Sequence, residues 1–193
     1  MKSKKSSTQL SRQKILEARA RLLAQLPEEK SDARESLELV TFHIDHEYLG
    51  MATSLVVEAH PLKTLHWSRL PSDFLSHAPA FIVGVVNMRG HIYSITDLAR
   101  FVGLPAHPIS DKAHILLLRG GLCTDGKEME LTLLSDDVPQ VERVLLKNLN
   151  PPPDTVSATM KAYLLGITPN MLMVLDMQRL LSDERLIVQE SET

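Results

Sequence analysis

The clearest pattern of apolar and polar positions lies in residues 78–104, the run APAFIVGVVNMRGHIYSITDLARFVGL. Residues 81–86 are apolar apart from one glycine, residues 91–96 form a second strand-like run, and residues 87–90 between them are turn residues. Asparagine and glycine tolerate the left-handed backbone of a tight turn. Two strand-like runs joined by such a turn predict a β-hairpin.

A short helix is expected directly after this hairpin. Thr96 and Asp97 are both favourable N-cap residues, and the helix should end at Gly103, before Pro105. Within the turn itself, Arg89 is a lone cation between two apolar strands. A charged residue at this position indicates a specific contact or role.

Short strand-like runs continue along the chain, and the sequence predicts about ten of them after residue 37. Besides the hairpin, they cover residues 39–44, 48–53, 54–59, 113–119, 128–135, 138–146, 160–167 and 171–175. Residues 60–77 are expected to be irregular, Gly120 and Gly121 to end a strand, and Pro139 to lie in an edge strand or a bulge. Closely spaced strands with only short helices favour an all-β barrel or sandwich.

Two segments of the chain share a faint internal similarity. Residues 84–102 and 166–181 each contain a glycine, a turn, an apolar strand, an aspartate and a helix-like end. Two copies of one β unit would explain this similarity.

The N-terminal segment, residues 1–36, differs from the rest of the chain. Its first 14 residues are polar, basic and rich in serine, which predicts disorder. An amphipathic helix is expected at about residues 11–26, with one apolar face formed by Ile15, Leu16, Leu22, Leu23 and Leu26. This helix either packs on the body of the protein or binds a partner or a second copy. Residues 37–182 form the predicted folded domain, and residues 183–193 a C-terminal tail.

The composition of the chain indicates which classes of protein fit the sequence. The chain has 193 residues, 44% hydrophobic and 23% charged, which is typical of a globular domain. The net charge of −3 without a basic stripe argues against nucleic-acid binding. Cys123 is the only cysteine, so a reducing compartment is expected. Because no apolar run approaches the roughly 20 residues of a membrane span, and the N-terminus does not resemble a signal peptide, we expect a cytoplasmic protein without membrane insertion.

The sequence offers little support for catalysis, a metal or a cofactor. Three potential metal ligands lie close together in the sequence, namely His43, Asp45 and His46. Residues three apart on a strand point to opposite faces, so His43 and His46 can converge only if the turn at Asp45 reverses the chain between them. Gly84 and Gly90 do not form a phosphate loop, because no Gly-Lys-Ser/Thr follows. We therefore predict no catalytic, metal or cofactor site. Two alternatives stay open: a small β-barrel metal-dependent hydrolase using His43, His46 and nearby acids, and a ligand-sensing module.

The run at residues 78–104 resembles the signature of CheW-like domains, the scaffold proteins of bacterial chemosensory arrays. The resemblance rests on the Pro-Ala-Phe-Ile lead at residues 79–82, the Asn-x-Arg-Gly turn at residues 87–90 and the Asp-Leu helix start at residues 97–98. It extends in register over residues 37–182. It implies an all-β fold of two intertwined five-stranded SH3-like β-barrel subdomains with short helices, and no enzymatic activity.

The resemblance also implies partners and a site. CheW-like proteins bridge the cytoplasmic tips of methyl-accepting chemoreceptors to the regulatory domain of a CheA-like histidine kinase. By position, Arg89 corresponds to the turn arginine of the family and Glu58 to the carboxylate with which it pairs. We expect partner-binding residues at this turn and its anchor, namely Glu58, Val86, Asn87, Met88, Arg89 and Gly90. The hairpin also carries four apolar residues whose role depends on the face they occupy, namely Val85, Val86, Met88 and Ile92. Those that face inward are expected to be core residues, and any that strand alternation turns outward is expected to be an interface residue.

Three departures from the family pattern affect the choice of pathway. Ser94 stands where the family usually has a proline, residues 131–136 lack the usual glycine-containing strand, and residues 1–36 exceed a minimal member. These departures indicate either a parallel pathway, such as one controlling type IV pili or biofilm, or coupling to an unusual kinase, in place of the main chemotaxis array.

Overall fold

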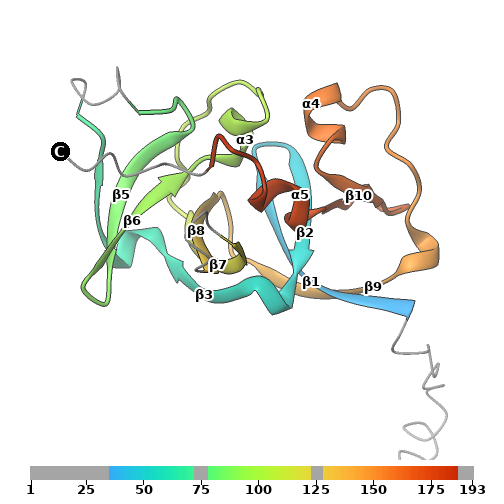
Figure 1. Cartoon of the computed structure of the whole chain (residues 1–193), viewed down its shortest axis with the longest axis horizontal. Helices are drawn as coiled ribbons and strands as arrows, with labels where there is room; N and C mark the ends of the chain where they lie inside the picture. The colour runs from blue at the N-terminus through green and yellow to red at the C-terminus, as the bar shows by residue number, and fades with distance from the viewer. Residues whose placement is uncertain (1–34, 72–77, 123–127, 187–193) are drawn as a thin grey trace, which may run out of the picture. The chain divides into compact units, whose positions relative to one another are not determined.

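The computed structural model describes residues 35–71, 78–122 and 128–186. The predicted helix at residues 11–26 lies outside the described residues, as do the hairpin turn expected at residues 124–127 and the end of the C-terminal tail. The described part is mainly β structure, arranged as two sheets with short helices (Figure 1).

The first sheet has five strands, in the order β10-β11-β2-β1-β9. These strands are β1 (Ser36–Ile44), β2 (Glu47–Ala52), β9 (Gln140–Leu145), β10 (Leu164–Ile167) and β11 (Met173–Leu175). They come from the beginning and the end of the described chain, and the pairing of β11 with β2 is parallel.

The second sheet has six strands, in the order β3-β7-β8-β6-β5-β4. These are β3 (Val56–Pro61), β4 (His66–Arg69), β5 (Ile82–Met88), β6 (His91–Thr96), β7 (His114–Leu122) and β8 (Glu128–Ser135). All of them lie between β2 and β9 in the chain, so the two sheets are interleaved along the sequence. Two intertwined β-barrel subdomains were expected, and the structure confirms the coarser feature, two interleaved β-sheets.

Helical structure in the described residues is limited to short segments. The α-helices are α3 (Leu98–Phe101), α4 (Ala158–Lys161) and α5 (Met177–Leu181), and the 3-10 helices are η2 (Thr53–Leu55), η3 (Leu62–Thr64) and η4 (Leu146–Asn148). None of the helices in this part of the chain has the length and apolarity needed to cross a membrane.

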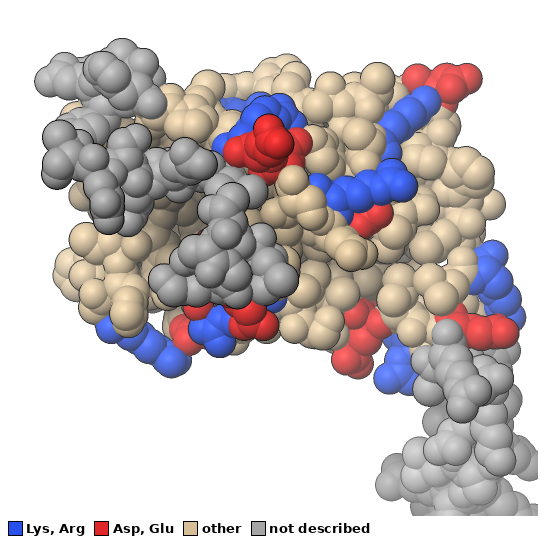
Figure 2. All heavy atoms as spheres, in the orientation of Figure 1, with Lys and Arg blue, Asp and Glu red and all other residues tan. Residues whose placement is uncertain are grey.

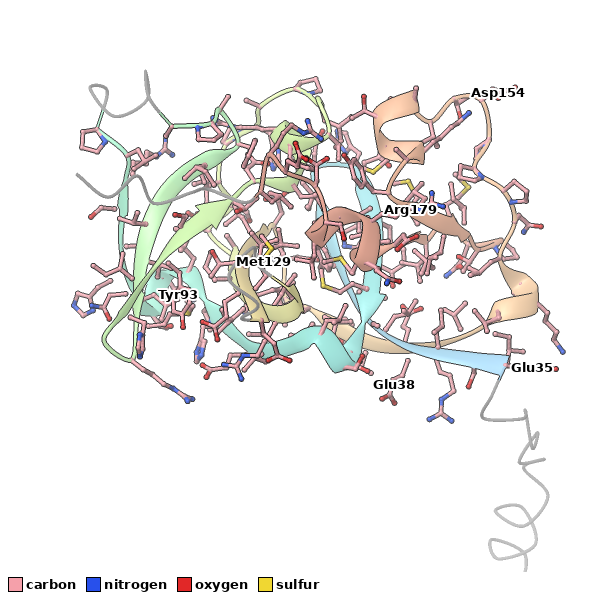
Figure 3. The ribbon with its side chains drawn as sticks, in the orientation of Figure 1. Glu35, Glu38, Tyr93, Met129, Asp154 and Arg179 are labelled. Carbon is pink, nitrogen blue, oxygen red and sulfur yellow. The ribbon has the colours of Figure 1, made fainter. Side chains whose placement is uncertain are left out.

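The largest apolar core lies between the two sheets and the short helices. Phe42 and Leu49 come from the five-stranded sheet, and Leu133 and Met129 from the six-stranded sheet, with Met129 labelled in Figure 3. Leu180 of α5 belongs to the same cluster and is fully buried. Burial of a side chain of this size contributes about 1.5 to 3 kcal/mol relative to leaving it exposed. This shared core makes the folding of each sheet depend on the other.

The predicted internal repeat is present in the structure. The β5–β6 hairpin leads into α3, and the β10–β11 hairpin leads into α5. The second strand of each hairpin then pairs in parallel with another part of the chain, β6 with β8 and β11 with β2. Five strands of the six-stranded sheet, taken as β5-β6-β8-β7-β3, therefore follow the same neighbour pattern as β10-β11-β2-β1-β9.

The two helices of the repeat begin with the same N-cap. The side chain of Asp97 accepts a hydrogen bond from the backbone N–H of Arg100, and Asp176 does the same for Arg179, each over 3.2 Å. Each arginine side chain also lies close to its aspartate, at 3.0 Å for Arg100 and 3.2 Å for Arg179. The predicted N-cap at Asp97 is confirmed, and so is the predicted helix end, where Gly103 has a φ of +80°.

Three details of the strand prediction were wrong. Residues 60–77 are not wholly irregular, because β4 pairs with β5 and adds a sixth strand to its sheet. The strand β7 continues through Gly120 and Gly121 to Leu122, with an irregular register after Arg119 that the glycines permit. Residues 158–161 form α4 rather than the start of a strand. In each case a pairing or a packing contact distant in sequence determines the structure.

A polar cluster fixes the end of the described chain to the body. The Arg185 guanidinium contacts Asp183 at 3.0 Å, donates to the Tyr163 hydroxyl at 2.8 Å and lies 4.2 Å above the ring of Phe101. The hydrogen bond from Arg185 is the main reason that the pKa of Asp183 is lowered to about 2. This cluster joins α3 and the residue before β10 to the segment that follows α5.

We expect that Asp97→Ala lowers the free energy of unfolding by about 2 to 3 kcal/mol and Asp176→Ala by only about 1 kcal/mol. Both variants lose a helix cap, but the Asp97 side chain is more deeply buried, 5% against 17% exposed, so its loss leaves buried partners unpaired. Urea unfolding of the two variants measures the difference. An equal loss, or a larger loss for Asp176→Ala, would contradict the account of the caps.

We expect that Asp183→Asn lowers stability near neutral pH by on the order of 1 to 2 kcal/mol. The folded-state pKa of about 2 lies below the ordinary 3.8, so the unfolded chain takes up the proton first. The contribution of Asp183 is therefore complete above about pH 5 and declines as the pH falls toward 2. The gap between the urea midpoints of the two proteins should narrow between pH 7 and pH 3 without closing, because pH 3 still lies above the folded-state pKa of about 2.

Asp154→Asn is the control for this pH series, because the Asp154 side chain is fully exposed and its ion pair is with the Lys161 side chain. Its stability should follow the wild type at every pH. A constant gap between the wild type and Asp183→Asn down to pH 3 would rule out the lowered pKa as the cause.

Candidate functional site

The β5–β6 turn has a defined left-handed geometry. Met88 pairs with His91, which leaves Arg89 and Gly90 as a two-residue loop with φ values of 54° and 87°. Positive φ at both loop residues is typical of the type I′ turn, whose twist matches that of a β-hairpin. The Asn87 side chain accepts a hydrogen bond from the Gly90 N–H at 3.0 Å. The hairpin thus holds an arginine in a conformation that non-glycine residues rarely adopt.

This turn is tied to an edge strand of the same sheet. The Arg89 Nη1 atom lies 3.0 Å from the Glu58 Oε1 atom of β3. The second carboxylate oxygen, Oε2, lies 2.6 Å from the Nε2 atom of His60. Glu58 is only 16% exposed and Arg89 is 77% exposed, so the carboxylate is the recessed anchor and the guanidinium faces solvent. The contact expected between these two residues is present.

The other residues expected at the site occupy two different environments. Asn87 and Gly90 are exposed beside Arg89. Val86 and Met88 are 1% and 5% exposed and belong to the core of the six-stranded sheet. Their side chains therefore pack beneath the turn, and their expected role in partner binding stays a prediction. Ile92 is the apolar residue of this hairpin that alternation turns outward, at 74% exposure.

A hollow of about 330 Å³ adjoins the turn. It is lined by Val57, Glu58, Met88, Arg89, His91, Tyr93, Leu117, Arg119 and Glu130, which come from β3, β5, β6, β7, β8 and the turn. Figure 3 labels Tyr93 at this end of the six-stranded sheet. In Figure 2 cationic and anionic atoms alternate along the lower left edge of the view, where Figure 1 draws the β5–β6 turn and β3. The polar groups therefore converge on one surface.

A second ion pair lies in this hollow. Arg119 and Glu130 are direct cross-strand partners, and the Arg119 Nη2 and Nε atoms donate to the same Glu130 oxygen at 2.6 and 3.0 Å. The Tyr93 hydroxyl donates to the other oxygen at 3.0 Å. The hydrogen bond from Arg119 is the main cause that lowers the pKa of Glu130. Burial, followed by the bond to Glu130, raises the pKa of Tyr93.

Sequence reasoning missed this second pair. The sequence predicted a strand at residues 128–135, and Glu130 lies on its exposed side. That prediction could not show that Arg119 lies opposite, because the register between β7 and β8 passes an irregularity after Arg119. With the correct register between β7 and β8, Arg119 and Glu130 would have been recognised as a cross-strand pair of opposite charge.

The histidines considered as metal ligands do not converge. The Nδ1 atom of His43 lies 2.7 Å from Asp137, whereas His46 is almost fully exposed and 3.6 Å from Asp45. Among the described residues, no group of three His, Cys, Asp or Glu side chains is placed to hold a metal ion. His43 instead helps to join β1 to the segment between β8 and β9, where the Asp136 N–H donates to the His43 carbonyl at 2.9 Å.

Comparisons with a family model and with known proteins all indicate the same family. The model of the CheW-like domain family matches residues 38–185. A probable chemotaxis protein CheW of Rhizobium etli is 26% identical over 117 residues, which cover 58% of this chain and 71% of that protein. The chemotaxis protein CheW of Rhizobium meliloti is 27% identical over 97 residues, 50% of this chain and 59% of that protein.

A solved structure supports the fold. The crystal structure of the scaffolding protein TtCheW from Thermoanaerobacter tengcongensis superposes with a TM-score of 0.54 at 24% identity. The match covers 72% of this chain and 86% of that one. TtCheW is named a scaffolding protein, and the match to it shows the fold. Because the family model spans most of its length, the chain belongs to the CheW-like domain family.

Proposed function

We propose that this chain is a cytoplasmic adaptor that couples the tips of chemoreceptors to a CheA-like histidine kinase. The observation that carries the proposal is the family match over residues 38–185. It is supported by the contact between Arg89 and Glu58, the two residues that the family resemblance singled out. Both curated relatives described above are named chemotaxis proteins.

The mechanism of such an adaptor is geometric. It makes and breaks no covalent bond, and it holds two partners in a fixed register. A receptor can change the activity of the kinase through the adaptor only if its contacts differ between two conformational states. An arginine held by the backbone and by a recessed carboxylate suits this task, because little side-chain freedom remains to be lost on binding.

We place the receptor at the six-stranded sheet, around the turn that carries Arg89. The exposed guanidinium there provides directional donors, whereas the buried residues beneath it keep the turn rigid. The kinase then binds elsewhere on the interleaved sheets. Such a division leaves both partners in contact with one rigid body at the same time.

The pathway that we favour is a parallel chemosensory system, such as one for type IV pili or biofilm control. Two departures from the family pattern meet in space, because the Thr132 hydroxyl donates to the backbone carbonyl of Ser94 where β6 and β8 run parallel. Ser94 follows Tyr93 on β6, and Thr132 lies on the neighbouring strand β8. Altered residues at this position suit a partner different from that of the main array.

We expect Arg89→Ala to weaken binding of a chemoreceptor cytoplasmic fragment by about tenfold while the fold survives, as loss of one directional charged contact implies. Glu58→Gln should weaken binding less, because the arginine remains but loses its anchor. The double variant should be little worse than Arg89→Ala alone, since the two residues act as a unit. Isothermal calorimetry measures the affinities, and urea unfolding checks the fold.

Arg143→Ala is the matched control for this series. Arg143 is also an exposed arginine with a glutamate partner, Glu38 at 3.7 Å, but it lies on β9 of the five-stranded sheet. Its loss should leave receptor affinity unchanged. Folded Arg89→Ala protein with wild-type affinity for both receptor and kinase would remove the turn from the proposed interface.

A further inference from the structure

The two ion pairs in the hollow share one arrangement. In the pair at the turn, Arg89 is 77% exposed and Glu58 16%, and in the second pair Arg119 is 47% exposed and Glu130 31%. In both pairs the carboxylate is recessed and the guanidinium lies nearer to solvent. A molecule that approaches this surface therefore meets guanidinium N–H groups before it meets carboxylate oxygens.

The second arginine is held at least as firmly as the first. Glu130 accepts two hydrogen bonds from the Arg119 guanidinium and a third from the Tyr93 hydroxyl, which holds the carboxylate in place. The lowered pKa of Glu130 keeps this anchor ionised at physiological pH. Fixing a long side chain in advance reduces the entropy lost when a partner binds.

Apolar side chains lie at the floor and rim of the hollow. Val57, 43% exposed, stands beside the two arginines, and the nearly buried side chains of Met88 and Leu117 lie beneath them. An apolar centre beside charged groups is the usual composition of a protein interface, and removal of water strengthens charged hydrogen bonds there. The hollow is concave, so it suits a narrow protruding segment better than the broad face of another β-sheet domain.

We propose that Arg89 and Arg119 together form a two-arginine surface that binds acidic side chains at the tip of the receptor. Arg119 is the specificity-determining residue, because it selects receptors that carry a second acid at the matching position. This inference rests on the proposed adaptor function and adds to it the chemistry of the receptor segment. The kinase, which binds elsewhere on the sheets, does not depend on Arg119.

The test uses the full chain and cytoplasmic fragments of the chemoreceptors from the same cell. Arg119→Gln is expected to lower the affinity for the cognate fragment by about tenfold and to reduce its dependence on salt concentration. Arg119→Lys should retain part of the affinity, because the charge stays but the planar fork is lost. Binding of the kinase regulatory domain should be the same for all three proteins.

Two control variants test whether a loss of affinity comes from lost recognition of the receptor or from a change in net charge, and unfolding experiments test whether it comes from a loss of folding. The double variant Arg119→Gln with Glu130→Gln keeps the net charge and should still bind the receptor fragment about tenfold more weakly. Arg143→Gln changes the net charge by the same amount as Arg119→Gln but lies on the other sheet, and it should bind as the wild type does. Urea unfolding of each variant verifies that it is folded.

A charge exchange identifies the receptor residue. Arg119→Glu should abolish binding, and one Asp→Arg or Glu→Arg substitution in the receptor tip should restore it. Folded Arg119→Gln that binds every receptor fragment as the wild type does, while Arg89→Ala does not, would overturn the two-arginine surface and leave the adaptor function standing. A wild-type chain that binds no receptor fragment would overturn the adaptor function itself.

Discussion

The register of the β5–β6 hairpin is the constraint on which the candidate site depends. The pairing of Met88 with His91 leaves a loop of two residues, so Arg89 takes a left-handed backbone and reaches Glu58 on β3. A shift of one residue would exchange the two faces of the strand and bring Val86 and Met88 out of the core. The cost of exposing two such apolar side chains is about 3 to 6 kcal/mol, which is ample to fix the register. The geometry of the charged surface thus follows from the packing beneath it.

Local chemistry in the sequence was sufficient for some elements and not for others. The hairpin turn and the Asp97 cap depend on neighbouring residues, and they were predicted correctly, whereas the alternation expected for residues 128–135 ends at Leu131, because residues 131–135 are all buried. The strand β4 was missed because its four residues become a strand only by pairing with β5. The pair of Arg119 and Glu130 was missed for a related reason, since it depends on a register that no local pattern contains.

The internal repeat shows how one unit can produce two different surfaces. Each of the two hairpins is followed by a helix with an Asp-x-x-Arg cap, and each has a non-glycine residue with positive φ in its connecting loop. In the six-stranded sheet that residue is Arg89, which is tied to a carboxylate. In the five-stranded sheet it is Met171, which is 60% exposed. The corresponding loop of the repeat therefore presents a charged residue on one sheet and an apolar residue on the other.

The central claim is that the chain joins a receptor to a kinase in a single complex. The most direct measurement is retention of the purified CheA-like kinase on an immobilised receptor cytoplasmic fragment, with and without the full chain. The account predicts that the kinase is retained in proportion to the amount of added chain, and that all three proteins elute together. Retention that is equal with and without the chain, or a chain that binds each partner only in competition with the other, would contradict it.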